Sequence, residues 1–178
     1  MSRAVLISIR PKWCEKIADG EKTIEVRKTR PKLETPFRGY IYRTKGIVPH
    51  IINGKWVKIA VGGTVVGEFV CDKIYELAPL NHAPDDVEQM ACLTREEIVQ
   101  YLRGVGYGWH ISDLKIYNQP KELNEFWFPP ELYCEKERCG SCPYDQMADV
   151  NGEYGYDCEW KRPLNRAPQS WQYVEELK

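Results

Sequence analysis

Residues 20–27 carry the combination of side chains in this chain that is best suited to chemistry. They read Gly-Glu-Lys-Thr-Ile-Glu-Val-Arg, so that Lys22, Glu25 and Arg27 follow one glycine in the pattern G-x-K-x-x-E-x-R. Such a set could bind a phosphate or carbonyl group, or support hydrolysis with Glu25 as general base on water and Lys22 or Arg27 stabilising the oxyanion. The alternative is a solvated strand face, on which an exposed Glu25–Arg27 pair would contribute little.

Two short elements position this motif. The first is a helix predicted over residues 11–19, because the segment starts with proline and carries apolar residues at helical spacing. Gly20 ends it, since glycine adopts the left-handed conformation at a helix C-terminus without a steric penalty. The second is a strand predicted over residues 23–28, where apolar and polar residues alternate. Strict alternation places Lys22 on the apolar side with Ile24, so Lys22 reaches a cleft only through a twist or bulge.

Further polar and aromatic residues accompany this motif. The candidates for ligand binding each carry a polar group or a ring, and they are Ser8, Arg10, Trp13, Lys22, Thr23, Glu25, Arg27, Trp109 and Ser170. A ring beside basic groups suits a flat base that carries a phosphate or a carbonyl group. Trp109 either stacks on such a base or packs in the core. The neighbouring His110 is more typical of a structural residue than of a general base.

The order of these segments resembles an ASCH domain, a branch of the PUA-like β-barrel superfamily. The similarity begins with residues 7–11, Ile-Ser-Ile-Arg-Pro, followed by the short helix and the G-x-K-x-x-E-x-R motif. It continues in the strand-like segments 65–69, 109–111 and 168–174. The resemblance implies an α+β fold, a mixed β-barrel with two or three helices, in a single domain over residues 1–178.

The resemblance also implies a class of ligand. ASCH and other PUA-like domains are generally linked to RNA or modified-nucleobase recognition in the cleft beside this motif, and some are hydrolases acting on N4-acetylcytidine or on RNA. In the amidohydrolases a lysine, a threonine three residues later and a glutamate from a later segment form the catalytic set. Lys22 matches the lysine, but Glu25 stands at the threonine position, and the match of the glutamate with Glu88 is loose.

These residues therefore favour recognition of RNA, a nucleotide or a modified nucleobase through a basic cleft beside the motif. The alternative is a small hydrolase, either an amidohydrolase on N4-acylated cytidine-type nucleosides or a ribonuclease, that uses Lys22 and Glu25. A third hypothesis is a protein-interaction module that uses the cysteine-rich insert described next.

A second set of reactive side chains consists of four cysteines with the spacing C-x4-C-x2-C-x15-C. They are Cys134, Cys139, Cys142 and Cys158, in an insert at about 134–160 that is poor in aliphatic residues. Four thiolates around zinc would supply the folding energy that such a segment lacks, and they would leave no open position, so the zinc would be structural. An iron–sulfur cluster and unliganded or redox-paired cysteines are the alternatives, while disulfides are disfavoured without a secretion signal.

Three further local signals concern the scaffold. Asn53-Gly54 between apolar segments predicts a hairpin at about 46–58, as an elaboration of the fold. The long apolar run at 64–77 is expected to supply a central strand. The capping box that starts at Thr94 predicts a helix with Tyr101 on its apolar face.

Composition and charge limit the classes of function. The chain has 178 residues, 43% of them hydrophobic, which is enough for one sizeable core. No apolar run approaches the ~20 residues that cross a bilayer, and the N-terminus lacks a signal sequence, so we expect a cytoplasmic protein without a membrane partner. Residues 1–38 hold ten Lys/Arg and five Asp/Glu, against fifteen and twenty-one in the remainder. This mild local basicity suits a nucleotide or a short single strand better than nonspecific binding to duplex.

Overall fold

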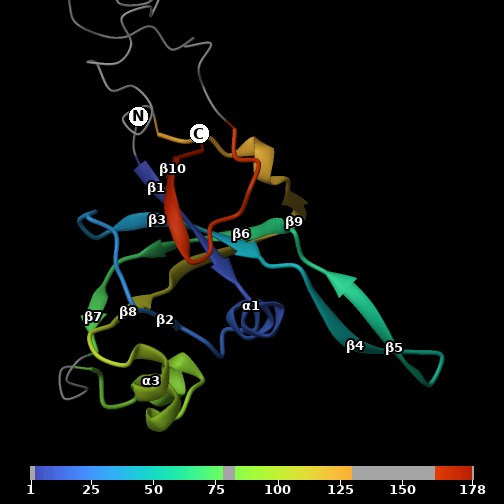
Figure 1. Ribbon diagram of the computed structural model, residues 1–178, viewed down its shortest axis with the longest axis horizontal. Helices are drawn as coiled ribbons and strands as arrows, with labels where there is room; N and C mark the ends of the chain where they lie inside the picture. The colour runs from blue at the N-terminus through green and yellow to red at the C-terminus, as the bar shows by residue number, and fades with distance from the viewer. Residues whose placement is uncertain (1–2, 78–82, 130–162, 178) are drawn as a thin grey trace, which may run out of the picture.

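A computed structural model describes residues 3–77, 83–129 and 163–177. The four cysteines of the predicted zinc insert lie outside these ranges. The described strands form a five-stranded sheet, a three-stranded sheet and a two-stranded hairpin (Figure 1).

The five-stranded sheet has the order β10-β1-β3-β6-β9. Its strands are β1 (Arg3–Ile9), β3 (Phe37–Arg43), β6 (Thr64–Cys71), β9 (Ser112–Lys121) and β10 (Trp171–Glu175). β1 pairs in parallel with β3 and antiparallel with β10, whereas β3, β6 and β9 pair antiparallel. Residues 4–9 are all buried, as expected of an apolar strand covered on both faces.

The three-stranded sheet has the order β2-β8-β7 and consists of β2 (Ile24–Arg27), β8 (Tyr107–His110) and β7 (Ile74–Glu76). β6 and β7 divide the apolar run at 64–77, because the exposed pair Asp72 and Lys73 separates them. β6 is an interior strand of the five-stranded sheet, as expected of this run, and β7 is a second strand that joins the other sheet.

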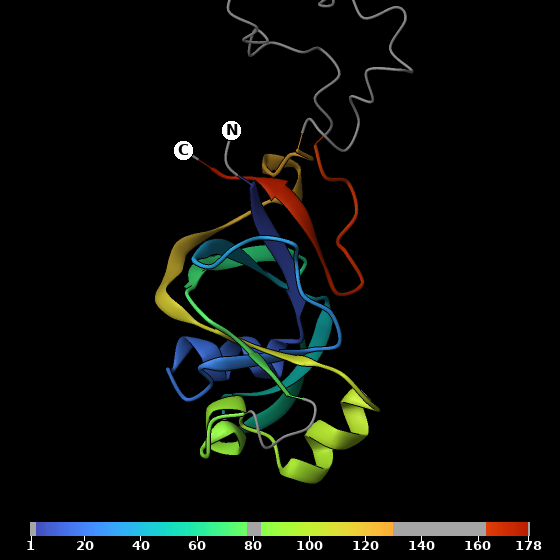
Figure 2. The same cartoon turned by 90° about the vertical axis from the view of Figure 1, so that its left-hand side faces the viewer.

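The mixed β-strands expected of a β-barrel are present, but the described strands do not close into a barrel. β9 and β10 form the edges of one sheet, β2 and β7 those of the other, and no ladder among the described strands joins these edges. The two sheets instead curve around a shared core, in which Phe37, Phe69 and Trp109 are buried (Figure 2).

The described residues include three α-helices, in agreement with the two or three expected. α1 (Pro11–Ala18) starts with proline and ends before Gly20, which has a φ of 75°. α2 (Val87–Ala91) and α3 (Arg95–Leu102) pack against β2, and the predicted capping box at Thr94 begins α3. A short 3-10 helix spans Leu123–Glu125. None of the helices in the described ranges has the length and apolar character needed to cross a bilayer.

The hairpin predicted at about 46–58 consists of β4 (Gly46–Ile52) and β5 (Lys55–Val61). Asn53 and Gly54 form its turn with positive φ angles of 52° and 76°, the conformation that such a dipeptide favours. β4 and β5 pair with each other and with no other described strand, and they project from the sheets (Figure 1).

Candidate ligand-binding site

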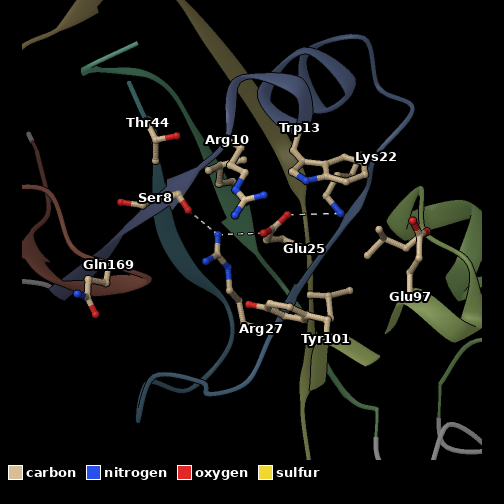
Figure 3. Close-up of a pocket in the computed structure, with 13 residues that line it drawn as sticks. Ser8, Arg10, Trp13, Lys22, Glu25, Arg27, Thr44, Glu97, Tyr101 and Gln169 are labelled. Atoms are coloured by element: carbon tan, nitrogen blue, oxygen red, sulfur yellow. Dashed lines mark hydrogen bonds and ion pairs between the residues drawn. The ribbon is translucent and has the colours of Figure 1, made fainter. Parts of the chain in front are cut away.

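A cavity of about 400 Å³ lies beside β2 (Figure 3). Its walls come from β1, α1, β2, α3 and the segments that follow β3 and precede β10. The lining residues are Ser8, Ile9, Arg10, Trp13, Lys22, Glu25, Val26, Arg27, Thr44, Leu93, Glu97, Tyr101 and Gln169. The volume lies within the range of small-molecule sites, so the cavity can hold a ligand about the size of a nucleoside.

Lys22, Glu25 and Arg27 form a buried charged triad in this cavity, with exposed fractions of 3%, 7% and 7%. Glu25 Oε1 lies 2.9 Å from Arg27 Nη2, and Glu25 Oε2 lies 3.4 Å from Lys22 Nζ. Buried charges are costly unless they are paired, so the pairing keeps all three groups in place. This burial removes the alternative of a solvated strand face.

Lys22 reaches the cavity because β2 begins only at Ile24, so that strand alternation does not govern its direction. Its Nζ donates to the backbone oxygens of Ile24 at 2.8 Å and Ala91 at 2.7 Å, in addition to facing Glu25. Burial lowers the pKa of Lys22, and the Glu25 carboxylate partly opposes that effect. Two of the three N–H groups of Lys22 are therefore used in hydrogen bonds to the backbone, and its contact with Glu25 Oε2 at 3.4 Å is an ion pair.

Arg27 joins the strands around the cavity. Its Nη2 donates to the backbone oxygen of Ser8 at 2.7 Å, and its Nη1 donates to Ser170 Oγ at 3.3 Å. The hydroxyl of Ser8 in turn donates to the backbone oxygen of Pro168 at 2.6 Å. β1, β2 and the segment before β10 are therefore held together at one wall of the cavity.

Two buried polar atoms of the triad can still form hydrogen bonds. Glu25 Oε2 and Arg27 Nε have no hydrogen-bond partner among the described residues. Arg10 is exposed, and its guanidinium points toward Glu25 in Figure 3. The Trp13 ring lies on the far side of Glu25 from Tyr101 in that view, with Lys22 Nζ 5.2 Å from its centroid. The cavity thus combines a carboxylate oxygen that accepts no hydrogen bond from the described residues, basic groups and aromatic rings.

The structure brings together most of the residues predicted from the sequence. Those that line the cavity are Ser8, Arg10, Trp13, Lys22, Glu25 and Arg27. Ser170 holds Arg27 without lining the cavity. Thr23 is absent from the lining, and its backbone bonds to Met90 and Ile111.

Trp109 lies in the core rather than in the cavity. It is opposite Glu25 in the β2–β8 ladder, but its side chain is 0% exposed, with its ring 5.9 Å from Phe37 and 5.8 Å from Trp171 between centroids. It therefore packs rather than stacks on a ligand.

Glu88 and His110 also have other partners. Glu88 Oε1 accepts from Arg95 Nε at 2.8 Å and does not line the cavity. His110 Nδ1 lies 2.7 Å from Asp72 Oδ1, again away from the lining residues. Neither residue is placed to act on a ligand in this cavity.

Sequence reasoning missed four polar residues of the lining, which are Thr44, Glu97, Tyr101 and Gln169. Tyr101 was expected on the apolar face of its helix, yet it is 44% exposed. Gln169 directly precedes Ser170, which was predicted as a site residue, and this adjacency in the sequence could have indicated Gln169 as well. Thr44 and Glu97 carry no comparable signal, because tertiary packing alone brings them to the cavity.

The fold and this cavity define a small α+β domain with a ligand-sized polar site. The ASCH domain model matches residues 7–149, and the chain belongs to the ASCH domain family. ASCH domains are generally associated with RNA.

Solved structures of the ASCH protein from Zymomonas mobilis share the fold. The protein without substitutions matches with a TM-score of 0.55 and 17% identity, covering 97% of this chain and 88% of that chain. Two point mutants of the same protein match with TM-scores of 0.56 and 0.55 and 16% identity, each covering 97% of this chain and 91% and 89% of theirs. No curated protein sequence matches this chain.

Proposed function

We propose that this chain recognises a nucleotide or a modified nucleobase, free or within RNA, with the base in the cavity beside Glu25. The observation that carries the proposal is Glu25 Oε2, a buried carboxylate oxygen that is ion-paired with Lys22 Nζ at 3.4 Å but has no hydrogen-bond partner among the described residues. Leaving such an atom unsatisfied costs about 1–3 kcal/mol, so a ligand that brings an N–H donor to it gains affinity. The edges of nucleobases supply such donors.

Two other lining groups suit the remainder of a nucleotide. Trp13 is half-buried on α1, and an aromatic ring that stacks on a base contributes about 1–3 kcal/mol. Arg10 offers a guanidinium for a phosphate or carbonyl oxygen, which it binds through charge-assisted hydrogen bonds. The basic N-terminal segment and the association of the family with RNA support the same class of ligand.

The alternative function is a small hydrolase that uses Lys22 and Glu25. Two observations favour binding over this reaction. The donors of Lys22 are directed at protein acceptors, and Glu25 stands where the amidohydrolases carry a threonine hydroxyl. Of the hydroxyls in the lining, that of Ser8 is already bound to the backbone of Pro168.

Calorimetric titration tests the proposal with pairs of nucleotides that differ in one donor. Cytidine monophosphate presents an amino group, whereas its N4,N4-dimethyl derivative has no N–H on the base edge. Uridine monophosphate presents an N–H on its base edge, whereas 3-methyluridine monophosphate does not, so this pair makes the same comparison. We expect the donor-bearing member of a recognised pair to bind at least about tenfold more tightly, since a hydrogen bond to a charged group contributes about 1.5–3 kcal/mol.

Glu25→Gln should weaken this preference, because an amide oxygen accepts a weaker hydrogen bond than a carboxylate, and Glu88→Gln, an identical change outside the cavity, should retain it in full. Equal affinity for the two members of each pair, or an unchanged preference in Glu25→Gln, would refute the role of Glu25. Mass spectrometry of N4-acylated cytidines and short RNAs incubated with the wild type and with Lys22→Ala tests the hydrolase. Product formed by the wild type alone would establish it; we expect none.

We also propose that Cys134, Cys139, Cys142 and Cys158 hold one structural zinc ion. Their spacing and thiolate chemistry support this assignment. An interaction role for the insert predicts that deletion of residues 134–158 loses a protein partner and leaves nucleotide affinity unchanged.

A further inference from the structure

The hairpin of β4 and β5, here called the arm (residues 45–61), lies outside the two larger sheets. Its strands pair only with each other within the described residues. A two-stranded hairpin is marginally stable in water when nothing covers it. The arm nevertheless carries large apolar side chains into solvent and projects away from both sheets (Figure 1).

One face of the arm is exposed along its whole length. The register pairs Ile47 with Ala60, Pro49 with Lys58 and Ile51 with Trp56, and residues directly opposite in an antiparallel ladder point to the same side. The arm face therefore consists of Ile47, Pro49, Ile51, Trp56, Lys58 and Ala60, all of which are exposed. Trp56 is 73% exposed and Ile47 is 69% exposed. Apolar residues gathered on one exposed face mark an interaction surface.

The charge of the arm selects the kind of partner. Residues 45–61 include Lys45, Lys55 and Lys58 and no aspartate or glutamate. A partner with anionic groups and flat apolar groups would match both the lysines and Trp56. A nucleic-acid strand with unstacked bases has this combination, since phosphates alternate with rings that stack on aromatic side chains.

The arm is also continuous with the cavity. Thr44 lines the cavity, and Lys45 and Gly46 follow it directly into β4. Gly46 lies against α1, where an added Cβ would be 3.1 Å from Pro11 Cγ. Arg10 of the cavity wall directly precedes Pro11. A ligand that extends from the cavity therefore meets the base of the arm within a basic part of the chain.

We propose that the arm face binds single-stranded RNA that continues from a nucleotide held in the cavity. The proposal rests on the nucleotide-binding role proposed for the cavity. Trp56 stacks on a base and Lys58 binds a phosphate. Seven-residue strands extend about 23 Å, so the arm reaches well beyond the nucleotide in the cavity. A second copy of this face is the poorer partner, because two such faces would bring lysines together without carboxylates.

Fluorescence anisotropy with a labelled single-stranded RNA of about twelve nucleotides tests the arm, and calorimetry with the mononucleotide monitors the cavity separately. We expect Trp56→Ala to weaken RNA binding at least about fivefold, and Trp56→Phe to restore most of the loss. Lys58→Ala should reduce the slope of log affinity against log salt by about 0.7, whereas Trp56→Ala should leave the slope unchanged. Lys55→Ala, an identical charge change on the opposite face, is the matched control and should weaken RNA binding less.

Mononucleotide affinity should be the same in all four variants. Unchanged RNA affinity in Trp56→Ala and Lys58→Ala would overturn the proposal and leave the cavity function standing if the mononucleotide still binds. Wild-type protein that binds the mononucleotide but not the RNA would overturn it in the same way. Failure of both ligands to bind the wild type would overturn both proposals. A change in molar mass by light scattering in Trp56→Ala, with RNA affinity intact, would assign the arm face to a second copy of the chain instead.

Discussion

Glu25→Gln tests the central claim about the buried triad, because it removes a charge and keeps the shape of the side chain. In the wild type one carboxylate faces two buried cations, at 2.9 Å from Arg27 and 3.4 Å from Lys22. The amide leaves both cations without a counter-charge, and removing one partner of a buried ion pair costs about 3–5 kcal/mol. The free energy of unfolding of a protein of this size is about 5–15 kcal/mol, so the loss would be a large fraction of its stability.

Urea unfolding followed by tryptophan fluorescence measures this loss. With an m value of about 2 kcal/mol/M, a loss of 3–5 kcal/mol lowers the midpoint by about 1.5–2.5 M. The matched control is Glu21→Gln, which removes a carboxylate from the exposed pair with Lys16, whose atoms are 2.6 Å apart. We expect that control to leave the midpoint nearly unchanged, because exposed ion pairs contribute little. Equal midpoints for Glu25→Gln and Glu21→Gln would refute the reasoning that burial makes the triad important.

Three further predictions concern other parts of the chain. Burial raises the pKa of the Cys14 thiol from 9.0 to about 12, so the unfolded chain loses this proton first and stability falls as the pH rises above 9. Cys14→Ala should make that fall shallower by about 1.4 kcal/mol per pH unit, as measured by urea unfolding at several pH values. Purified protein should contain one zinc per chain by plasma mass spectrometry, and Cys139→Ser should lose it. Gly62→Ala should be more destabilising than Gly54→Ala in thermal unfolding: both glycines have positive φ, but only at Gly62 would a Cβ collide with the Thr44 carbonyl oxygen.

The local elements were predictable from sequence because short-range chemistry determines them. Pro11 and Gly20 bracket α1, Asn53-Gly54 forms the hairpin turn, and Thr94 begins α3 with a complete capping box. Each signal acts within a few residues, through a fixed φ, a positive φ or a side chain that bonds to a nearby backbone N–H.

The arrangement of strands was less predictable, because it depends on which ladders form. Asp72 and Lys73 end β6 and let the chain change sheets, although the surrounding residues are apolar enough for one continuous strand. Trp109 illustrates the same limit for the site. Its type suits both stacking and core packing, and only the contacts with Phe37 and Trp171 assign it to the core.

The site was predictable where the residues share one stretch of sequence. Lys22, Glu25 and Arg27 are neighbours in the chain, and all three line the cavity. Tyr101 and Gln169 reach the same cavity from segments about 75 and 140 residues away, as their numbers show. No sequence pattern near either residue indicates that it lines the cavity.

The position of β1 has a consequence for how the protein forms during synthesis. β1 lies between β3 and β10, and the hydrogen bond that Arg27 donates to Ser170 connects the two distant parts of the chain at the cavity wall. Until the ribosome has released β10, one edge of β1 stays unpaired and apolar, which is the kind of edge that invites pairing with another chain. Contacts across such long sequence separation also slow folding. A nascent chain would therefore be most prone to aggregation, and unable to complete its cavity, in the interval before β10 docks.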